Sequence, residues 1–199
     1  MEISSKDVSK LREKTGVGMM DCKKALLECG GDFDKAVEYL RKKGMEVANK
    51  RQGRTASQGM VSAYIHMGGK VGVLVEVNCE SDFVAKSENF QNFVKDIGMH
   101  IAAASPEWVN KEDVPQDVLD KEKEIYREQA LKSGKPEKIL DKIAEGRLAK
   151  FFSERCLMEQ PFVKDTDKTI KELLDELMGK TGEKCQIRRF ARFALGEEI

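Results

Sequence analysis

The sequence lacks most of the features by which common functional classes are recognised. Its formal net charge is zero, with 35 basic and 35 acidic residues, so nothing indicates a general attraction to nucleic acid or anionic lipid. No apolar run approaches the roughly 20 residues that a membrane-spanning helix needs. The first residues, MEISSKDVSKLREK, lack the apolar stretch of a secretory signal. We therefore expect a cytoplasmic protein with no membrane partner.

Cysteine and histidine are too few and too scattered to indicate a metal site. The two histidines, His66 and His100, belong to no cluster of ligands. The five cysteines form no C-x-x-C pair and lie at positions 22, 29, 79, 156 and 185. This spacing argues against a zinc site and a disulfide framework, so we interpret the cysteines as reduced, mostly buried thiols. We predict neither a metal ion nor a cofactor.

Motifs of covalent catalysis are also missing. The sequence has no G-x-x-x-x-G-K-[ST] loop, no G-x-S-x-G elbow and no H-E-x-x-H pair. Cys79 and His66 could meet across a hairpin, but no third group to orient them is evident, and packing explains the pair better. We predict that the protein is not an enzyme, and an enzyme of unknown type is the last alternative.

Glycines and capping residues divide the first 49 residues into three short helices. A second helix is expected from about Met19 to Cys29, and Asp32 can cap a third. We expect Gly44 to end that third helix. Because so small a bundle is only marginally stable alone, residues 1–49 are interpreted as a docking module of a longer chain.

The rest of the sequence predicts a mixed fold. Residues 50–58 are polar and basic and are interpreted as a linker. Two alternating apolar runs then flank Gly68–Gly69, which predicts a β-hairpin. Helical patterns follow, and a third strand is expected from Cys185. The fold class is therefore α+β, with residues 59–199 forming a core in which helices cover a three-stranded antiparallel sheet.

The segment that follows the second expected strand carries an unusual phenylalanine. It reads NCESDFVAK over residues 78–86. Because the strand should end near Cys79 and the next regular helix begin around Ser87, Asp82 and Phe83 lie on the connection. A phenylalanine exposed there can anchor a partner, and its burial in a pocket would contribute about 1.5–3 kcal/mol. The residues alone leave equally open that Phe83 folds back over the end of the sheet.

Two long motifs resemble the signatures of a known family. LREKTGVGMMDCKKAL at 11–26 and EVNCESDFVAK at 76–86 are similar to the two signatures of the elongation factor Ts family, in the same order. The resemblance covers nearly the whole chain. Its shorter parts are MHIA at 99–102, SGKP at 133–136, EGR at 145–147, QPFV at 160–163 and IRRF at 187–190.

This resemblance implies a guanine-nucleotide exchange factor that releases GDP from GDP-bound elongation factor Tu without a cofactor. The N-terminal module would resemble a ubiquitin-associated three-helix bundle and dock on the nucleotide domain of Tu through Met19 and Met20. Asp82 and Phe83 would intrude near the magnesium and phosphate site of Tu. The partner-binding residues implied in this way are Asp82, Phe83, Val84, Met19, Met20, Leu11 and His100.

The chain departs from the family pattern in ways that bear on assembly. Ser81 stands where the family usually has threonine, and it keeps the hydroxyl group. The chain has room for one of the two core halves of longer members, and short members can form dimers. Phe190 is opposite in parity to Ile187 and Phe193, so both faces of this strand carry apolar groups, and we expect a homodimer built through it. Ala191 lies near a position where a cysteine could bridge the dimer, so we expect a non-covalent one.

Two other functions are compatible with parts of the sequence. A stand-alone ubiquitin-associated module would bind ubiquitin or a peptide, because residues 16–19 resemble the loop of such modules. A nucleic-acid binder would use the basic linker and Arg188, Arg189 and Arg192. The neutral net charge and the lack of interleaved aromatic residues argue against direct nucleic-acid binding.

Overall fold

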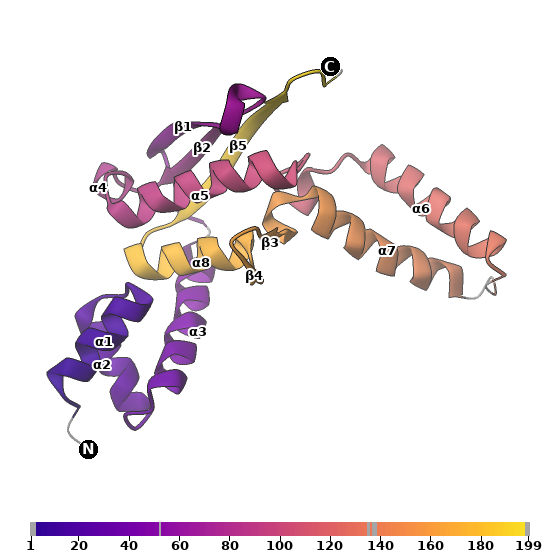
Figure 1. Ribbon diagram of the computed structural model, residues 1–199. Coiled ribbons are helices and arrows are strands. Elements are labelled where there is room, and N and C mark those ends of the chain that lie inside the picture. The colour runs from indigo at the N-terminus through magenta and orange to yellow at the C-terminus, as the bar shows by residue number, and fades with distance from the viewer. Residues whose placement is uncertain (1–2, 52, 135, 137–138, 198–199) are drawn as a thin grey trace. The chain divides into compact units, whose positions relative to one another are not determined.

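A computed structural model describes residues 3–51, 53–134, 136 and 139–197 (Figure 1). Its helices are α1 (Ser5–Thr15), α2 (Met19–Glu28), α3 (Phe33–Arg51), α4 (Asp82–Ala85), α5 (Glu88–Ala104), α6 (Gln116–Lys132), α7 (Leu140–Arg155) and α8 (Ile170–Thr181). Its strands are β1 (Gln58–Ile65), β2 (Val71–Cys79), β3 (Pro161–Phe162), β4 (Asp165–Thr169) and β5 (Cys185–Ala194). The predicted α+β class is confirmed. Lys135, part of the predicted SGKP motif, lies outside the described residues.

The chain forms two compact units. Unit 1 contains the chain up to Ser62, then Val75–Asp96 and Glu172–Arg188. Unit 2 contains Ala63–Leu74, Ile97–Lys171 and the chain from Arg189 onward. The boundary therefore passes through the sheet and through α5, so that each unit holds part of both.

The N-terminal part of unit 1 is the predicted bundle of three helices. The Ser4 side chain accepts a hydrogen bond from the Asp7 N–H (3.2 Å) and caps α1. At the other end of α1, Gly16 has φ 68°, and its N–H donates to the Arg12 carbonyl, a left-handed turn that glycine adopts readily. The side chains buried between the helices are Val8, Leu11, Cys22, Ala25, Leu26, Ala36 and Leu40.

The third helix is longer than its sequence predicts. Gly44 does not end it, because α3 continues through this glycine to Arg51 and so takes in the first residues of the predicted linker. Gly44 is instead buried where α3 passes Gly179 of α8. A glycine inside a helix costs about 1 kcal/mol relative to alanine, and here the lack of a side chain allows two helix backbones to approach closely.

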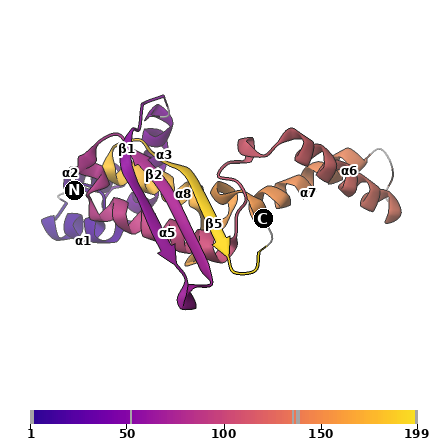
Figure 2. The same cartoon turned by 90° about the horizontal axis from the view of Figure 1, so that it is seen from above.

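The sheet has the strand order β1-β2-β5 and is antiparallel (Figure 2). The hairpin predicted around Gly68–Gly69 is confirmed, and the His66 N–H donates to the Val71 carbonyl (2.8 Å) where it closes. Helix α5 lies along one face of the sheet in both views (Figures 1 and 2). Side chains buried on β2 and α5 include Val73, Val75, Val77, Phe90, Val94, Ile97 and Ile101.

The last strand does not follow one simple alternation. Cys185 and Ile187 are buried, as their parity predicts, but Ala191 and Phe193 share that parity and are exposed. The alternation of buried and exposed side chains along β5 changes at Arg188–Arg189, where two consecutive side chains are exposed. The C-terminal half of β5 thus presents apolar groups to solvent.

Unit 2 contains a helical hairpin of α6 and α7. Its small core consists of Val114, Phe151 and Cys156, with Trp108, Val118, Leu119 and Phe152 packed around them. Its second helix, α7, begins at Leu140. The short antiparallel pair β3–β4 is not indicated by the sequence pattern, because these strands are short and polar residues dominate β4.

Candidate partner-binding site

The connection that follows β2 holds Phe83 out into solvent. Asp82–Ala85 form a single helical turn, α4, which we call the Asp-Phe turn. Val84 is buried on the inner side of this turn, whereas Phe83 is 81% exposed. The alternative in which Phe83 folds back over the end of the sheet is therefore not what the structure shows. An apolar ring held in this way is available to a partner.

Ser81 anchors the start of the Asp-Phe turn. Its side chain accepts a hydrogen bond from the Val84 N–H (3.3 Å), which caps the turn. The same hydroxyl donates to the Glu183 carboxylate (2.7 Å), and the Ser81 N–H donates to the other oxygen of Glu183 (3.0 Å). Each of these contacts needs only the hydroxyl and the backbone, so serine can hold the turn as threonine would.

Asp82 presents a charged carboxylate beside Phe83. Its side chain is 68% exposed and forms an ion pair with Lys86 (2.8 Å) one turn later. The hydrogen bond from Lys86 lowers the pKa of Asp82, so the carboxylate is charged at neutral pH. The Asp-Phe turn thus offers one anionic and one apolar side chain at adjacent positions.

Helix α2 carries a second exposed apolar surface in unit 1. Met19 is 42% exposed and Met20 76% exposed, so the core of the bundle does not cover these two long apolar side chains. Leu27, seven residues after Met20 and therefore on the same side of α2, is 53% exposed. Sequence reasoning missed Leu27, although its spacing from Met20 was a usable signal. We call Met19, Met20 and Leu27 the docking face.

Three of the predicted contact residues are buried and have no side-chain surface to offer. Leu11 lies in the core of the bundle, Val84 lies under the Asp-Phe turn, and His100 is completely buried in α5. The expectation of direct contact for these three residues stays a prediction, and their burial assigns them a place in the core of the free chain. The family motifs contain core residues as well as surface residues, and membership of a motif does not separate the two.

His100 has a structural role in unit 2. Its Nε2 lies 2.9 Å from Gln160 Oε1, and its Nδ1 accepts a hydrogen bond from the Val163 N–H (3.3 Å). The proton is therefore on Nε2, which donates to Gln160. Burial lowers the pKa of His100, so the ring is neutral and joins α5 to the QPFV segment.

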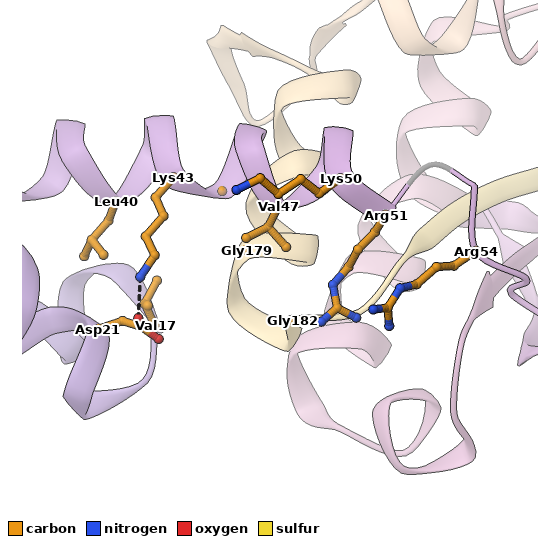
Figure 3. Close-up of a pocket in the computed structure, with 11 residues that line it drawn as sticks. Val17, Asp21, Leu40, Lys43, Val47, Lys50, Arg51, Arg54, Gly179 and Gly182 are labelled. Atoms are coloured by element: carbon orange, nitrogen blue, oxygen red, sulfur yellow. Dashed lines mark hydrogen bonds and ion pairs between the residues drawn. The ribbon is translucent and has the colours of Figure 1, made fainter.

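A pocket of about 430 Å³ opens in unit 1 between α3 and the C-terminal end of α8 (Figure 3). Its cationic side chains are largely paired within the chain. Lys43 forms an ion pair with Asp21 (2.5 Å), and Arg51 and Arg54 form ion pairs with Glu80. The other lining residues are Val17, Leu40, Gly44, Val47, Lys50, Gly179 and Gly182.

The part of the chain that the structure describes contains neither a metal-ligand cluster nor a membrane-spanning helix. No cluster of three or more histidine, cysteine, aspartate or glutamate side chains there could hold a metal ion. No helix among the same residues is long and apolar enough to cross a membrane. All five cysteines are free thiols, and four of them are buried.

Comparison with known proteins identifies the family. A family model described as Elongation factor TS matches residues 21–197. The chain is 60% identical to elongation factor Ts of Caldanaerobacter subterraneus over 99% of this chain and 98% of that protein. It is 60% identical to elongation factor Ts of Geotalea uraniireducens, over 100% of this chain and 92% of that protein. The chain belongs to the elongation factor Ts family.

Membership of this family of translation elongation factors confirms the resemblance of the sequence motifs. The Asp-Phe turn lies inside the range that the family model matches. Met19 and Met20 lie just before that range, but the alignment with the Geotalea protein includes them because it covers the whole chain.

Proposed function

We propose that this chain promotes the release of GDP from elongation factor Tu in the cytoplasm. The docking face binds the nucleotide domain of Tu, and the Asp-Phe turn disturbs the site where Tu holds magnesium and phosphate. No covalent bond is made or broken, so the protein acts as an exchange factor and not as an enzyme. The same proposal assigns docking to the module formed by the three-helix bundle, which the linker joins to the core.

The observation that carries this proposal is the exposure of Phe83 on an anchored turn. Ser81 and Glu183 hold the turn by two hydrogen bonds, so little conformational entropy is lost when the ring enters a pocket. Burial of the ring would contribute about 1.5–3 kcal/mol. Asp82 brings a negative charge to the same place, and a carboxylate there competes electrostatically with bound phosphate.

Thermodynamic linkage sets the coupling free energy that the exchange factor must supply. If the exchange factor lowers the affinity of Tu for GDP by a given ratio, GDP lowers the affinity of Tu for the exchange factor by the same ratio. A thousandfold loosening corresponds to about 4.1 kcal/mol of coupling free energy. Insertion of Phe83, together with a disturbed magnesium site, is of the right order to provide it.

The deciding experiment measures the release of labelled GDP from elongation factor Tu with and without this protein. We expect a large acceleration that saturates as the concentration of the factor increases. An unchanged rate over the accessible concentrations would refute the proposal. Binding to ubiquitin or to RNA under the same conditions, with none to Tu, would favour the alternatives from the sequence.

We further propose that two copies of the chain associate without a covalent bond. Four large apolar side chains of unit 2 are exposed around the hairpin and the C-terminal strand, namely Ile65, Leu74, Phe193 and Leu195. Arg192 forms an ion pair with Glu197 (3.1 Å), so its charge is balanced within the chain. An apolar surface is complementary to a second copy of itself, which suits a two-fold symmetric dimer.

A further inference from the structure

Glu80, two residues before Asp82, joins three parts of unit 1. Its carboxylate accepts a hydrogen bond from the Lys184 N–H (2.6 Å), in the connection between α8 and β5. The same carboxylate accepts from Arg51 (3.1 Å) at the end of α3 and from Arg54 (3.0 Å) just beyond it. Figure 3 shows the guanidinium groups of Arg51 and Arg54 close to one another, near Gly182 at the end of α8.

These contacts are partly sheltered from water. The side chain of Glu80 is 19% exposed and that of Arg51 is 27% exposed, whereas both partners of many other ion pairs among the described residues are more than 40% exposed. The pKa of Glu80 is lowered to about 2, chiefly because the Lys184 N–H donates to the carboxylate and also because Arg54 and Arg51 do. Glu80 therefore carries its charge throughout the physiological range, and the charge that attracts Arg51 and Arg54 is present throughout it.

Helix α3 connects the contacts of Glu80 to the docking module, the three-helix bundle. The helix starts inside the three-helix bundle, where Ala36 and Leu40 are buried, and ends at Arg51 without interruption. It is also fixed against α8, through the close approach of Gly44 to Gly179 and the ion pair of Arg41 with Glu172. A continuous helix that is held at several points transmits the position of one end to the other.

A second carboxylate, that of Glu183, joins the same two chain segments, and here the acceptor lies on the other segment. Glu80 accepts from the backbone of Lys184, and Glu183 accepts from the backbone and hydroxyl of Ser81. Glu80 and Ser81 of one segment are thus hydrogen-bonded to Lys184 and Glu183 of the other. The Lys184 ammonium group also donates to the Arg54 carbonyl (2.8 Å), which adds the end of the linker to the network.

We propose that Glu80 is a positioning residue that fixes the Asp-Phe turn relative to helix α3 and hence to the docking face. This inference rests on the proposed exchange function and adds a residue that contacts neither nucleotide nor Tu. With Glu80 in place, docking of the bundle presents Phe83 in one orientation. Without it, the bundle still docks, but the turn samples several orientations and enters the nucleotide site less often.

The test separates binding from the exchange step. The rate of GDP release from Tu is measured against the concentration of the factor, which yields a maximal rate and a half-saturating concentration. Two variants are compared with the parent chain: Glu80→Gln, and the double variant Arg51→Met with Arg54→Met. Lys42→Met is the matched control, because Lys42 is an exposed residue of α3 whose ion-pair partner is Glu38 of the same helix.

For both test variants we expect the maximal rate to fall by about tenfold, as for the loss of a charged hydrogen bond, with the half-saturating concentration changed by less than about threefold. The control should match the parent. A purely structural loss would instead lower thermal stability and raise the half-saturating concentration, with the maximal rate retained. Because Arg51 and Arg54 lie outside the core of the bundle, the double variant decides the question if Glu80→Gln does not fold.

Maximal rates equal to that of the parent in the double variant would overturn the role of Glu80. An equal loss from Lys42→Met would overturn it as well, because a general change of charge on α3 would then be the cause. Failure of the parent chain itself to accelerate GDP release would refute the proposed function, and this outcome is read from the parent chain alone, before any variant is compared with it.

Discussion

Gly44 of α3 and Gly179 of α8 let two helix backbones of unit 1 meet directly. A Cβ atom added to Gly179 would lie 2.9 Å from the Cα atom of Gly44, closer than carbon atoms normally approach. A Cβ atom added to Gly44 would lie 3.4 Å from the Asp175 carbonyl oxygen. Helix α3, which belongs to the same three-helix bundle as the docking face on α2, is thus packed against α8 by the absence of two side chains.

Gly179→Ala should therefore destabilise the protein. The new methyl group meets backbone, which cannot rotate away, and we expect a loss of about 1–3 kcal/mol in the free energy of unfolding. Gly146→Ala is the matched control, because Gly146 also lies inside a helix, α7, and no atom lies within 4 Å of an added Cβ. There the change should be neutral or stabilising by up to about 1 kcal/mol. Denaturant unfolding of both variants tests this, and equal effects would contradict it.

Replacing the exposed pair of the Asp-Phe turn should abolish exchange without unfolding the chain. Asp82→Ala with Phe83→Ala removes two exposed side chains and leaves Val84 and the Ser81 cap in place. We expect an unchanged unfolding midpoint and a loss of most of the GDP-release activity. Ile139→Ala, at an exposed apolar residue of unit 2, serves as the control. Release of GDP at the parental rate by the double variant would show that the turn does not intrude.

Charges on the docking face should weaken the complex with Tu. Met19→Asp with Met20→Asp places two carboxylates where we expect apolar contact, so affinity should fall by about tenfold or more. Because Met20 is 76% exposed, these changes should not unfold the bundle. Leu27→Asp should have a smaller effect in the same direction.

The docking variants are assayed by titration with Tu and by GDP release at saturating factor. The affinity should change more than the saturated release rate. Leu131→Asp, at an exposed leucine of α6, controls for an added charge on an apolar surface. A folded double variant with parental affinity would move the docking contact elsewhere in the chain.

The contribution of Glu80 to stability should depend on pH in a defined window. Its pKa is about 2 in the folded chain and about 4.5 when the residue is unperturbed, so the folded state binds the proton more weakly. The stabilisation is therefore complete well above pH 4.5 and is lost as the pH falls towards 2. Unfolding of the parent and of Glu80→Gln, measured between about pH 6 and 3, should give curves that converge at low pH. Parallel curves would show that the Glu80 charge contributes nothing.

Local patterns in the sequence were enough to place Asp82 and Phe83 on a connection, but not to predict its helical turn or the exposure of Phe83. The alternation of β2 and the start of α5 are both signals between neighbouring residues, and together they place Phe83 on a connection. The network around Glu80 could not be predicted, because Arg51 and Lys184 are brought to it only by folding. No local pattern shows which distant cation will reach a given carboxylate.

Residue type alone was equally insufficient at other positions. Gly44 looks the same in the sequence whether it ends a helix or permits close packing, and only the position of Gly179 decides between the two. Likewise, the family motifs did not show that Leu11 and His100 would be buried while Leu27 would be exposed. Exposure depends on the partners that the fold provides, which the motif does not contain.

The exposed apolar side chains of unit 2 lead to a prediction about assembly. Phe193 is 65% exposed and Leu195 81% exposed, and solvent exposure of such groups is unfavourable unless another surface covers them. The alternation of β5 changes at Arg188–Arg189, so Phe193 faces solvent although its parity matches that of buried Ile187. A second copy of the chain would cover Phe193 with its own apolar side chains.

Sedimentation at micromolar concentration should therefore show a mass near twice that of the chain. Reductant should not change this mass, because Ala191 offers no thiol on the exposed part of the strand and Cys185 is buried. Phe193→Glu should give a monomer, because two carboxylates would meet near the two-fold axis or lose their water in the interface. Ile125→Glu, at an exposed residue of α6, should stay dimeric and is the control. A parent chain that is monomeric at this concentration and fully active in GDP release would refute the dimer, because one copy would then be sufficient for exchange.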